Sequence, residues 1–257
     1  MSILLQYVRR RMKISKSSVK ELIPFLFTFA NVSFGFLSII KTIEGDFIAA
    51  ALSIMAAALM DSIDGRLARF FGTAGDLGSE LDSLCDAISF CLAPAVLLYS
   101  WYLHGFGNPG LFVPALVLYL CAGLLRLARF NLTANDQSLF FLGLPTTVAA
   151  FFFAQIVLYH ELVLDSTLGR LLNENVLVGL VASIAFLMVS TVRFPAFKKN
   201  NLSLKRAATY LKIALITGLA IWCLLHSYPF FLMIVSTYIL GGLFFHGFLR
   251  VKKVLKQ

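Results

Sequence analysis

Long apolar segments constrain the fold of this chain more than any other feature. Each is close to the roughly 20 residues that an α-helix needs to cross a bilayer core about 30 Å thick. Several run for seven or eight apolar residues without the alternation of a membrane β-strand. The sequence therefore predicts an all-α, polytopic membrane protein with about eight transmembrane helices. The predicted spans are residues 24–43, 47–71, 84–103, 111–130, 144–162, 176–192, 208–225 and 229–249.

Composition supports the same class. Charged residues make up 14% of the 257 residues, whereas soluble domains contain about a quarter. The mean hydropathy is +0.85. A chain of this composition places most of its apolar surface in lipid rather than around a single water-soluble core.

Lysine and arginine fall almost entirely on one side of the predicted topology. Eight spans put both termini on the same side, and 20 of the 22 basic residues lie there; Lys41 and Arg170 are the exceptions. Basic loops remain in the cytoplasm, so both termini are expected to be cytoplasmic. The chain then divides into a basic segment (1–20) that can form an interfacial helix, one transmembrane catalytic domain (21–250) and a basic tail (251–257). The positive charge is distributed by side of the membrane and is not gathered on one soluble face. This distribution predicts contact with anionic lipids and no nucleic-acid partner.

Against this apolar background, four aspartates cluster in DSIDGRLARFFGTAGDLGSELDSLCD, residues 61–86. Helical residues three, four, seven or eight positions apart share one face. One helix would then present Asp61, Asp64, Gly65, Ala68 and Arg69, and the next Gly78, Asp82 and Asp86. We expect the two helices to face each other across a short GTAG turn, with four carboxylates between them at the cytoplasmic interface.

Carboxylates this close repel one another and require countercharge. An all-oxygen site favours Mg²⁺ or Mn²⁺, with Ca²⁺ as a further option, over zinc. Two cations would suit phosphoryl transfer, because they stabilise both the attacking and the leaving oxygen. Gly65 and Ala68 would let a ligand approach the helix backbone, and Arg69 offers a planar fork for phosphate.

Two other interpretations compete with a phosphoryl-transfer site. Solvated carboxylates could pair with Arg66 and Arg69, but eight small or charged positions in register argue against this. An ion pathway would place carboxylates at the midpoints of several spans. The first span and the fourth to eighth spans contain no such carboxylate, so a divalent-cation transporter is the weaker hypothesis.

The same stretch resembles the signature D-x-x-D-G-x-x-A-R…G-x-x-x-D-x-x-x-D of the CDP-alcohol phosphotransferases, and all eight positions match. The resemblance implies displacement of CMP from a CDP-linked lipid by a second alcohol, with two divalent cations. It implies that Asp86 is the base for the acceptor hydroxyl. Metal ligation is implied for Asp61, Asp64, Asp82 and Asp86. Binding of the CDP-linked lipid is implied for Asp61, Asp64, Gly65, Ala68, Arg69, Gly78 and, in the first span, Asn31.

Other stretches are similar to the phosphatidylserine synthase branch of this family, which adds C-terminal spans to the six-span core. They are FTFANVSFGFLSI (27–39), LRLARFN (125–131) and FLGLPTTVAA (141–150). Thr146 and Thr147 depart from the pattern, since many relatives have a proline there. The resemblance implies CDP-diacylglycerol and L-serine as substrates, CMP as a product, a prokaryotic plasma membrane location and a homodimer.

The acceptor is expected to bind at the cytoplasmic end of the fourth span. Serine needs a cation for its carboxylate and acceptors for its ammonium. The candidate residues are Arg126, Arg129 and Asn131. Glycerol 3-phosphate would also attract arginines, so it is the first alternative acceptor and inositol the second. Anchoring of the helix end at lipid headgroups is the structural alternative for both arginines.

Overall fold

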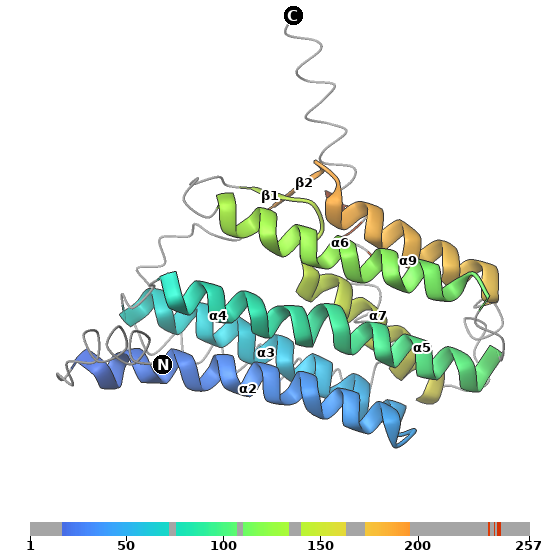
Figure 1. The fold of residues 1–257 in the computed structure, drawn as a ribbon, viewed down its shortest axis with the longest axis horizontal. Coiled ribbons are helices and arrows are strands. Elements are labelled where there is room, and N and C mark those ends of the chain that lie inside the picture. The colour runs from blue at the N-terminus through green and yellow to red at the C-terminus, as the bar shows by residue number, and fades with distance from the viewer. Residues whose placement is uncertain are drawn as a thin grey trace, which may run out of the picture.

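A bundle of long helices forms the part of the chain that the structure describes (Figure 1). The structure is a computed structural model, and it describes residues 17–71, 76–106, 110–133, 140–162 and 173–195, with residues 236, 239, 241 and 242. Most of the basic N-terminal segment, the predicted span at 208–225, nearly all of the span at 229–249 and the basic tail lie outside these residues.

Helices α2 (Ser17–Ile43) and α3 (Phe47–Phe71) pack side by side as an antiparallel pair (Figure 1). A three-residue turn joins them, and its Gly45 has φ of +80°, a conformation that glycine adopts without steric cost. The next residue, Asp46, accepts a hydrogen bond from the backbone N–H of Ala49 at 3.0 Å and so caps α3. This tight turn sets the register in which the two helices face each other.

After α2 and α3, the third long helical rod of the bundle consists of three consecutive segments. They are α4 (Asp76–Asp86), the π-helical segment η1 (Ala87–Leu92) and α5 (Ala93–Phe106). The sequence predicted a span at 84–103, but the helix begins earlier, at Asp76. As a result, Gly78, Asp82 and Asp86 all belong to one helix, as their spacing of four predicted.

Helices α6 (Phe112–Thr133), α7 (Thr146–Leu162) and α9 (Glu174–Val189) complete the described bundle. Two short strands, β1 (Phe140–Leu142) and β2 (Arg193–Pro195), pair antiparallel, with Phe141 opposite Phe194. The sequence did not predict these strands, because three residues are too few to show a period. The all-α class is confirmed for the bundle itself.

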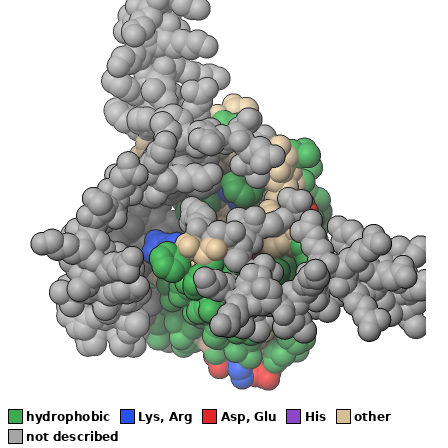
Figure 2. All heavy atoms as spheres, turned by 90° about the vertical axis from the view of Figure 1, so that its left-hand side faces the viewer, with side chains coloured by type: hydrophobic (Ala, Val, Ile, Leu, Met, Phe, Trp, Pro, Cys, Tyr) green, Lys and Arg blue, Asp and Glu red, His purple; other side chains and the backbone are tan. Residues whose placement is uncertain are grey.

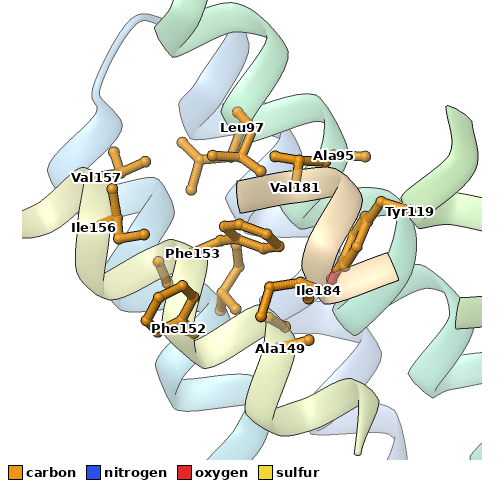
Figure 3. Packing of buried hydrophobic residues seen from close by; sticks show 14 of the residues in the cluster. Ala95, Leu97, Tyr119, Ala149, Phe152, Phe153, Ile156, Val157, Val181 and Ile184 are labelled. Atoms are coloured by element: carbon orange, nitrogen blue, oxygen red, sulfur yellow. The ribbon is translucent and has the colours of Figure 1, made fainter. Parts of the chain in front are cut away.

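An apolar core joins the later helices to the third rod. Phe153 of α7 lies in a cluster with Leu97 of α5, Val181 of α9 and Tyr119 of α6 (Figure 3). All four side chains are at most 2% exposed. Burial of large side chains is the main favourable contribution to packing of this kind, so the core fixes the position of α6 relative to η1 and α9.

The outside of the bundle is apolar as well. Within the described ranges, four helical stretches are long and apolar enough to cross a membrane, and α7 and α9 are shorter apolar helices. The four are Ile23–Ile43, Phe47–Leu67, Leu77–Gly105 and Phe112–Leu132. Large hydrophobic side chains such as Phe36 point outward, and Figure 2 shows hydrophobic side chains over the lower flank of the bundle. These features are those of an integral membrane protein.

Gly143, which follows β1, has φ of +79°, and a Cβ there would overlap the carbonyl of Met188. Gly143→Ala is therefore expected to lower the free energy of unfolding by about 1–3 kcal/mol. Gly179→Ala is the control, because a Cβ at this helical position meets nothing within 4 Å. It should leave stability unchanged or raise it by up to about 1 kcal/mol. Thermal unfolding of the purified protein in detergent compares the two, and equal stabilities would contradict the described turn.

Candidate active site

Three aspartates from two helices converge at one end of the bundle. Asp61 and Asp64 come from α3 and Asp82 from α4, and one carboxylate oxygen of each lies within 4.8 Å of the others. Asp64 is only 4% exposed. Within the described part of the chain, the buried atoms Asp64 Oδ2 and Asp82 Oδ1 have no hydrogen-bond partner. Buried acceptors without a donor are costly, so the group calls for an additional positive charge.

The donor set fits a hard divalent cation. Mg²⁺ and Ca²⁺ take oxygen ligands at about 2.0–2.6 Å, so oxygens that share one cation lie up to about 4–5 Å apart. The 4.8 Å limit on the three carboxylate oxygens falls in this range. The acidic group formed by Asp61, Asp64 and Asp82 can therefore bind a divalent cation.

Asp86 lies beside this acidic group. It is the last residue of α4 and only 8% exposed, and its charge interacts with those of Asp61 and Asp82. Its Oδ1 accepts a hydrogen bond of 3.0 Å from Nδ2 of Asn31, on α2. The structure thus brings the four aspartates into one electrostatic cluster and places Asn31 against Asp86.

The remaining signature positions occupy the same two helices. Gly65, Ala68 and Arg69 follow Asp64 along α3, and Gly78 precedes Asp82 in α4. A Cβ at Gly78 would meet nothing within 4 Å, so there is open space beside α4 at this point. The side chains of Ala68 and Arg69 lie outside the described part of the structure.

Arg126, on α6, is a buried cation close to the aspartates. It is 9% exposed, donates a hydrogen bond of 3.1 Å to Oγ1 of Thr146, and lies 5.5 Å from the centroid of the Phe130 ring. Its charge interacts with those of Asp86 and Asp61. Among the described residues, no carboxylate lies within 4.0 Å of its guanidinium. A buried charge without an ion-pair partner is costly, which suits an anionic ligand.

Arg129, one turn further along α6, has a different environment. Its guanidinium donates to the backbone carbonyls of Leu142 at 2.6 Å, Val189 at 2.9 Å and Met188 at 3.3 Å. The last carbonyls of an α-helix lack partners within the helix. Arg129 therefore caps the end of α9 and ties it to β1.

Asn131 connects α6 to α4. Its Oδ1 accepts a hydrogen bond of 2.9 Å from the Ser83 hydroxyl, and its Nδ2 donates to Glu80 Oε2 at 3.5 Å. Glu80, Ser83 and the hydroxyl of Thr146 were not predicted from the sequence as residues of the site. The available signal was the spacing of three that puts Glu80 and Ser83 on one face of α4.

Comparison with known proteins agrees with this geometry. A model of the CDP-alcohol phosphatidyltransferase family matches residues 21–181. A Helicobacter pylori protein named CDP-diacylglycerol–serine O-phosphatidyltransferase is 34% identical over 189 residues, which cover 72% of this chain and 76% of that protein. A Mycobacterium leprae protein of the same name is 31% identical over 225 residues, 85% of this chain and 72% of that protein.

Similarity extends to archaea. The archaetidylserine synthase of Methanothermobacter thermautotrophicus is 36% identical over 176 residues, 67% of this chain and 69% of that protein. The matched family region contains all four aspartates and all of α2 to α7 except the first residues of α2. The chain belongs to the CDP-alcohol phosphatidyltransferase family.

Removal of one carboxylate from the acidic group tests its capacity for metal. Asp82→Asn should weaken Mn²⁺ binding by more than the roughly 10- to 100-fold that loss of an outer-shell partner costs. Glu80→Gln, on the same helix but outside the acidic group, should leave Mn²⁺ affinity nearly unchanged. Titration of the purified variants followed by the electron paramagnetic resonance of free Mn²⁺ measures both. An equal loss of Mn²⁺ affinity in the two variants would show only a general effect of negative charge and would contradict a specific metal site.

Proposed function

We propose that this chain transfers the phosphatidyl group from CDP-diacylglycerol to the hydroxyl of L-serine, which yields phosphatidylserine and CMP. The observation that carries the proposal is the convergence of the α3 and α4 aspartates, at the spacing of the family signature, beside the buried cation of Arg126. The names of the bacterial relatives support serine as the acceptor.

The proposed reaction is a displacement at the phosphorus that carries the lipid. The serine hydroxyl gives its proton to the Asp86 carboxylate, and its oxygen forms a bond to that phosphorus. The bond from this phosphorus to the bridging oxygen breaks, and CMP leaves with that oxygen. Asp86 then releases the proton to water or to the CMP phosphate. A base must lie within hydrogen-bond reach of the hydroxyl, and Asp86 is the aspartate outside the three-carboxylate group.

The acidic group would hold divalent cations, with Mg²⁺ and Mn²⁺ as the first choices and Asp86 as a further ligand. When bound, such cations neutralise the diphosphate and stabilise the leaving oxygen. We assign the cytidine side of the donor to the stripe of Gly65, Ala68 and Arg69 on α3 and to Gly78 on α4. The open space at Gly78 supports this assignment.

Arg126 is the residue proposed to bind the serine carboxylate. It is buried, and its charge interacts with that of Asp86. Among the described side chains, its hydrogen-bond partner is the neutral hydroxyl of Thr146. Arg129 is assigned a positioning role instead, because backbone carbonyls occupy its donors. The oxygens of Asn131 and Glu80 are the proposed acceptors for the serine ammonium.

The orientation proposed for the enzyme follows the distribution of basic residues. With 20 of 22 on one side of an eight-span topology, the active site and both termini would face the cytoplasm. Assembly as a homodimer in a prokaryotic plasma membrane is proposed from the family resemblance and the bacterial relatives.

Acceptor specificity tests the proposal most simply. Purified protein is incubated with CDP-diacylglycerol, a divalent cation and one of serine, glycerol 3-phosphate or inositol, and CMP and the lipid product are quantified. We expect CMP release in equal amount to phosphatidylserine with serine alone. Release with glycerol 3-phosphate or inositol instead would reassign the acceptor. Uptake of metal into liposomes without CMP release would favour the transporter hypothesis.

Substitution of Arg126 tests its assignment to the serine carboxylate. A hydrogen bond to a charged group contributes about 1.5–3 kcal/mol to the free energy of binding. Arg126→Ala should therefore raise the KM for serine about 10- to 100-fold. The affinity for CDP-diacylglycerol should change much less. Arg66→Ala is the control, because Arg66 is an exposed arginine of α3. Loss of CDP-diacylglycerol binding with normal serine affinity would show that Arg126 binds the donor phosphates.

A further inference from the structure

The turn of helix that follows Asp86 has an unusual geometry and unusual contacts. In η1 the backbone is π-helical, a conformation that is rare and often found at functional sites. Two hydroxyl groups bind η1 to neighbouring helices. Tyr119 of α6 donates a hydrogen bond of 2.7 Å to the Phe90 carbonyl, and Ser89 donates one of 3.1 Å to the Asn31 carbonyl of α2. The segment is therefore held from two sides.

A glycine allows α2 to approach η1 closely. A Cβ at Gly35 would overlap the backbone and side chain of Ser89, so only glycine fits here without a shift. Asn31 lies one turn before Gly35 on the same face of α2. Close contact at Gly35 thus brings the Asn31 side chain, which is fully buried, to the Asp86 carboxylate.

The hydrogen bonding of Asn31 indicates that Asn31 is buried in order to contact Asp86. Nδ2 donates to Asp86 Oδ1, whereas Asn31 Oδ1 is buried without a partner among the described residues. A buried amide whose oxygen has no hydrogen-bond partner lowers the stability of the fold. The amide orientation is determined, because a carboxylate oxygen accepts hydrogen bonds and would repel Oδ1. An amide also orients a carboxylate without neutralising its charge, which an arginine or a lysine would do.

We propose that Asn31 is a positioning residue, which fixes the rotation of the Asp86 carboxylate so that it meets the acceptor hydroxyl. The torsion that rotates a carboxylate is broad, and misplacement of a reacting group by about 1 Å can cost 100-fold in rate. Asn31 holds one oxygen, and a base needs only one oxygen to accept a proton. Contacts of η1 with Tyr119 and Gly35 keep the pair in register. This inference rests on the function proposed for Asp86, and it replaces a direct role for Asn31 in binding the CDP-linked lipid.

Kinetics of three variants test the positioning role. Asn31→Leu keeps the branched shape of the side chain and removes the donor, so kcat should fall about 10- to 100-fold. The KM for serine and the dissociation constant for CDP-diacylglycerol should remain within about twofold of wild type, as a role confined to Asp86 requires. Tyr119→Phe removes only the hydroxyl that donates to the Phe90 carbonyl of η1, and kcat should fall roughly two- to tenfold. Ser38→Ala is the matched control, because it removes a buried hydroxyl of α2 that has no partner among the described residues; kcat should not change.

The outcomes separate the possible roles of Asn31. Unchanged kcat in Asn31→Leu, or a weaker affinity for CDP-diacylglycerol with normal kcat, would overturn the positioning role. If Asn31→Leu does not fold, unchanged kcat in Tyr119→Phe would overturn it equally. Each variant is assayed with the acceptor that supports CMP release by the wild type. A wild type that uses another acceptor would therefore refute serine as the substrate and leave the test of Asn31 intact.

Discussion

Burial of negative charge between apolar helices is the constraint on which the rest of the site depends. Asp64 and Asp86 are almost inaccessible, and Asp61 and Asp82 lie within charge-interaction distance of them. Removal of a carboxylate from water costs several kcal/mol unless counterions and hydrogen bonds replace the water. Each neighbour of the four aspartates supplies part of the positive charge or hydrogen bonding that water would otherwise provide. Asn31 donates to Asp86, Arg126 contributes positive charge, and the unmet oxygens of Asp64 and Asp82 suit a divalent cation.

The two arginines of α6, Arg126 and Arg129, have different roles at this site. Both stand near the same end of the helix, but Arg129 stabilises the scaffold through the carbonyls at the end of α9, whereas Arg126 stays close to the aspartates. Asn131 fixes the same end of α6 to α4 through Ser83. The guanidinium of Arg126 is thereby held on a helix that is tied both to the helix of Asp82 and to α9. Such support is what keeps a binding group in place when its ligand arrives.

Features with a short period could be predicted from the sequence. The apolar runs predicted the long helices, and the spacing of Asp61, Asp64, Asp82 and Asp86 predicted two helices that face each other. Contacts between distant residues could not be predicted this way. Asn31 and Asp86 are 55 positions apart, and Arg129 and Val189 are 60 apart. Sequence similarity placed Asn31 in the site but did not identify its partner. The π-helical geometry of η1 and the three-residue strands have no signature in residue type or period, because packing against α2, α6 and α9 determines them.

Transfer of an isotopic label tests whether the serine hydroxyl oxygen attacks the lipid-linked phosphorus. Serine labelled with heavy oxygen in its hydroxyl is incubated with CDP-diacylglycerol and the purified protein, and both products are analysed by mass spectrometry. We expect phosphatidylserine to contain the label between phosphorus and the serine carbon, and CMP to contain none. Label in CMP, or a lipid product without label, would contradict this mechanism, because the acceptor oxygen would then not have formed the new bond to phosphorus.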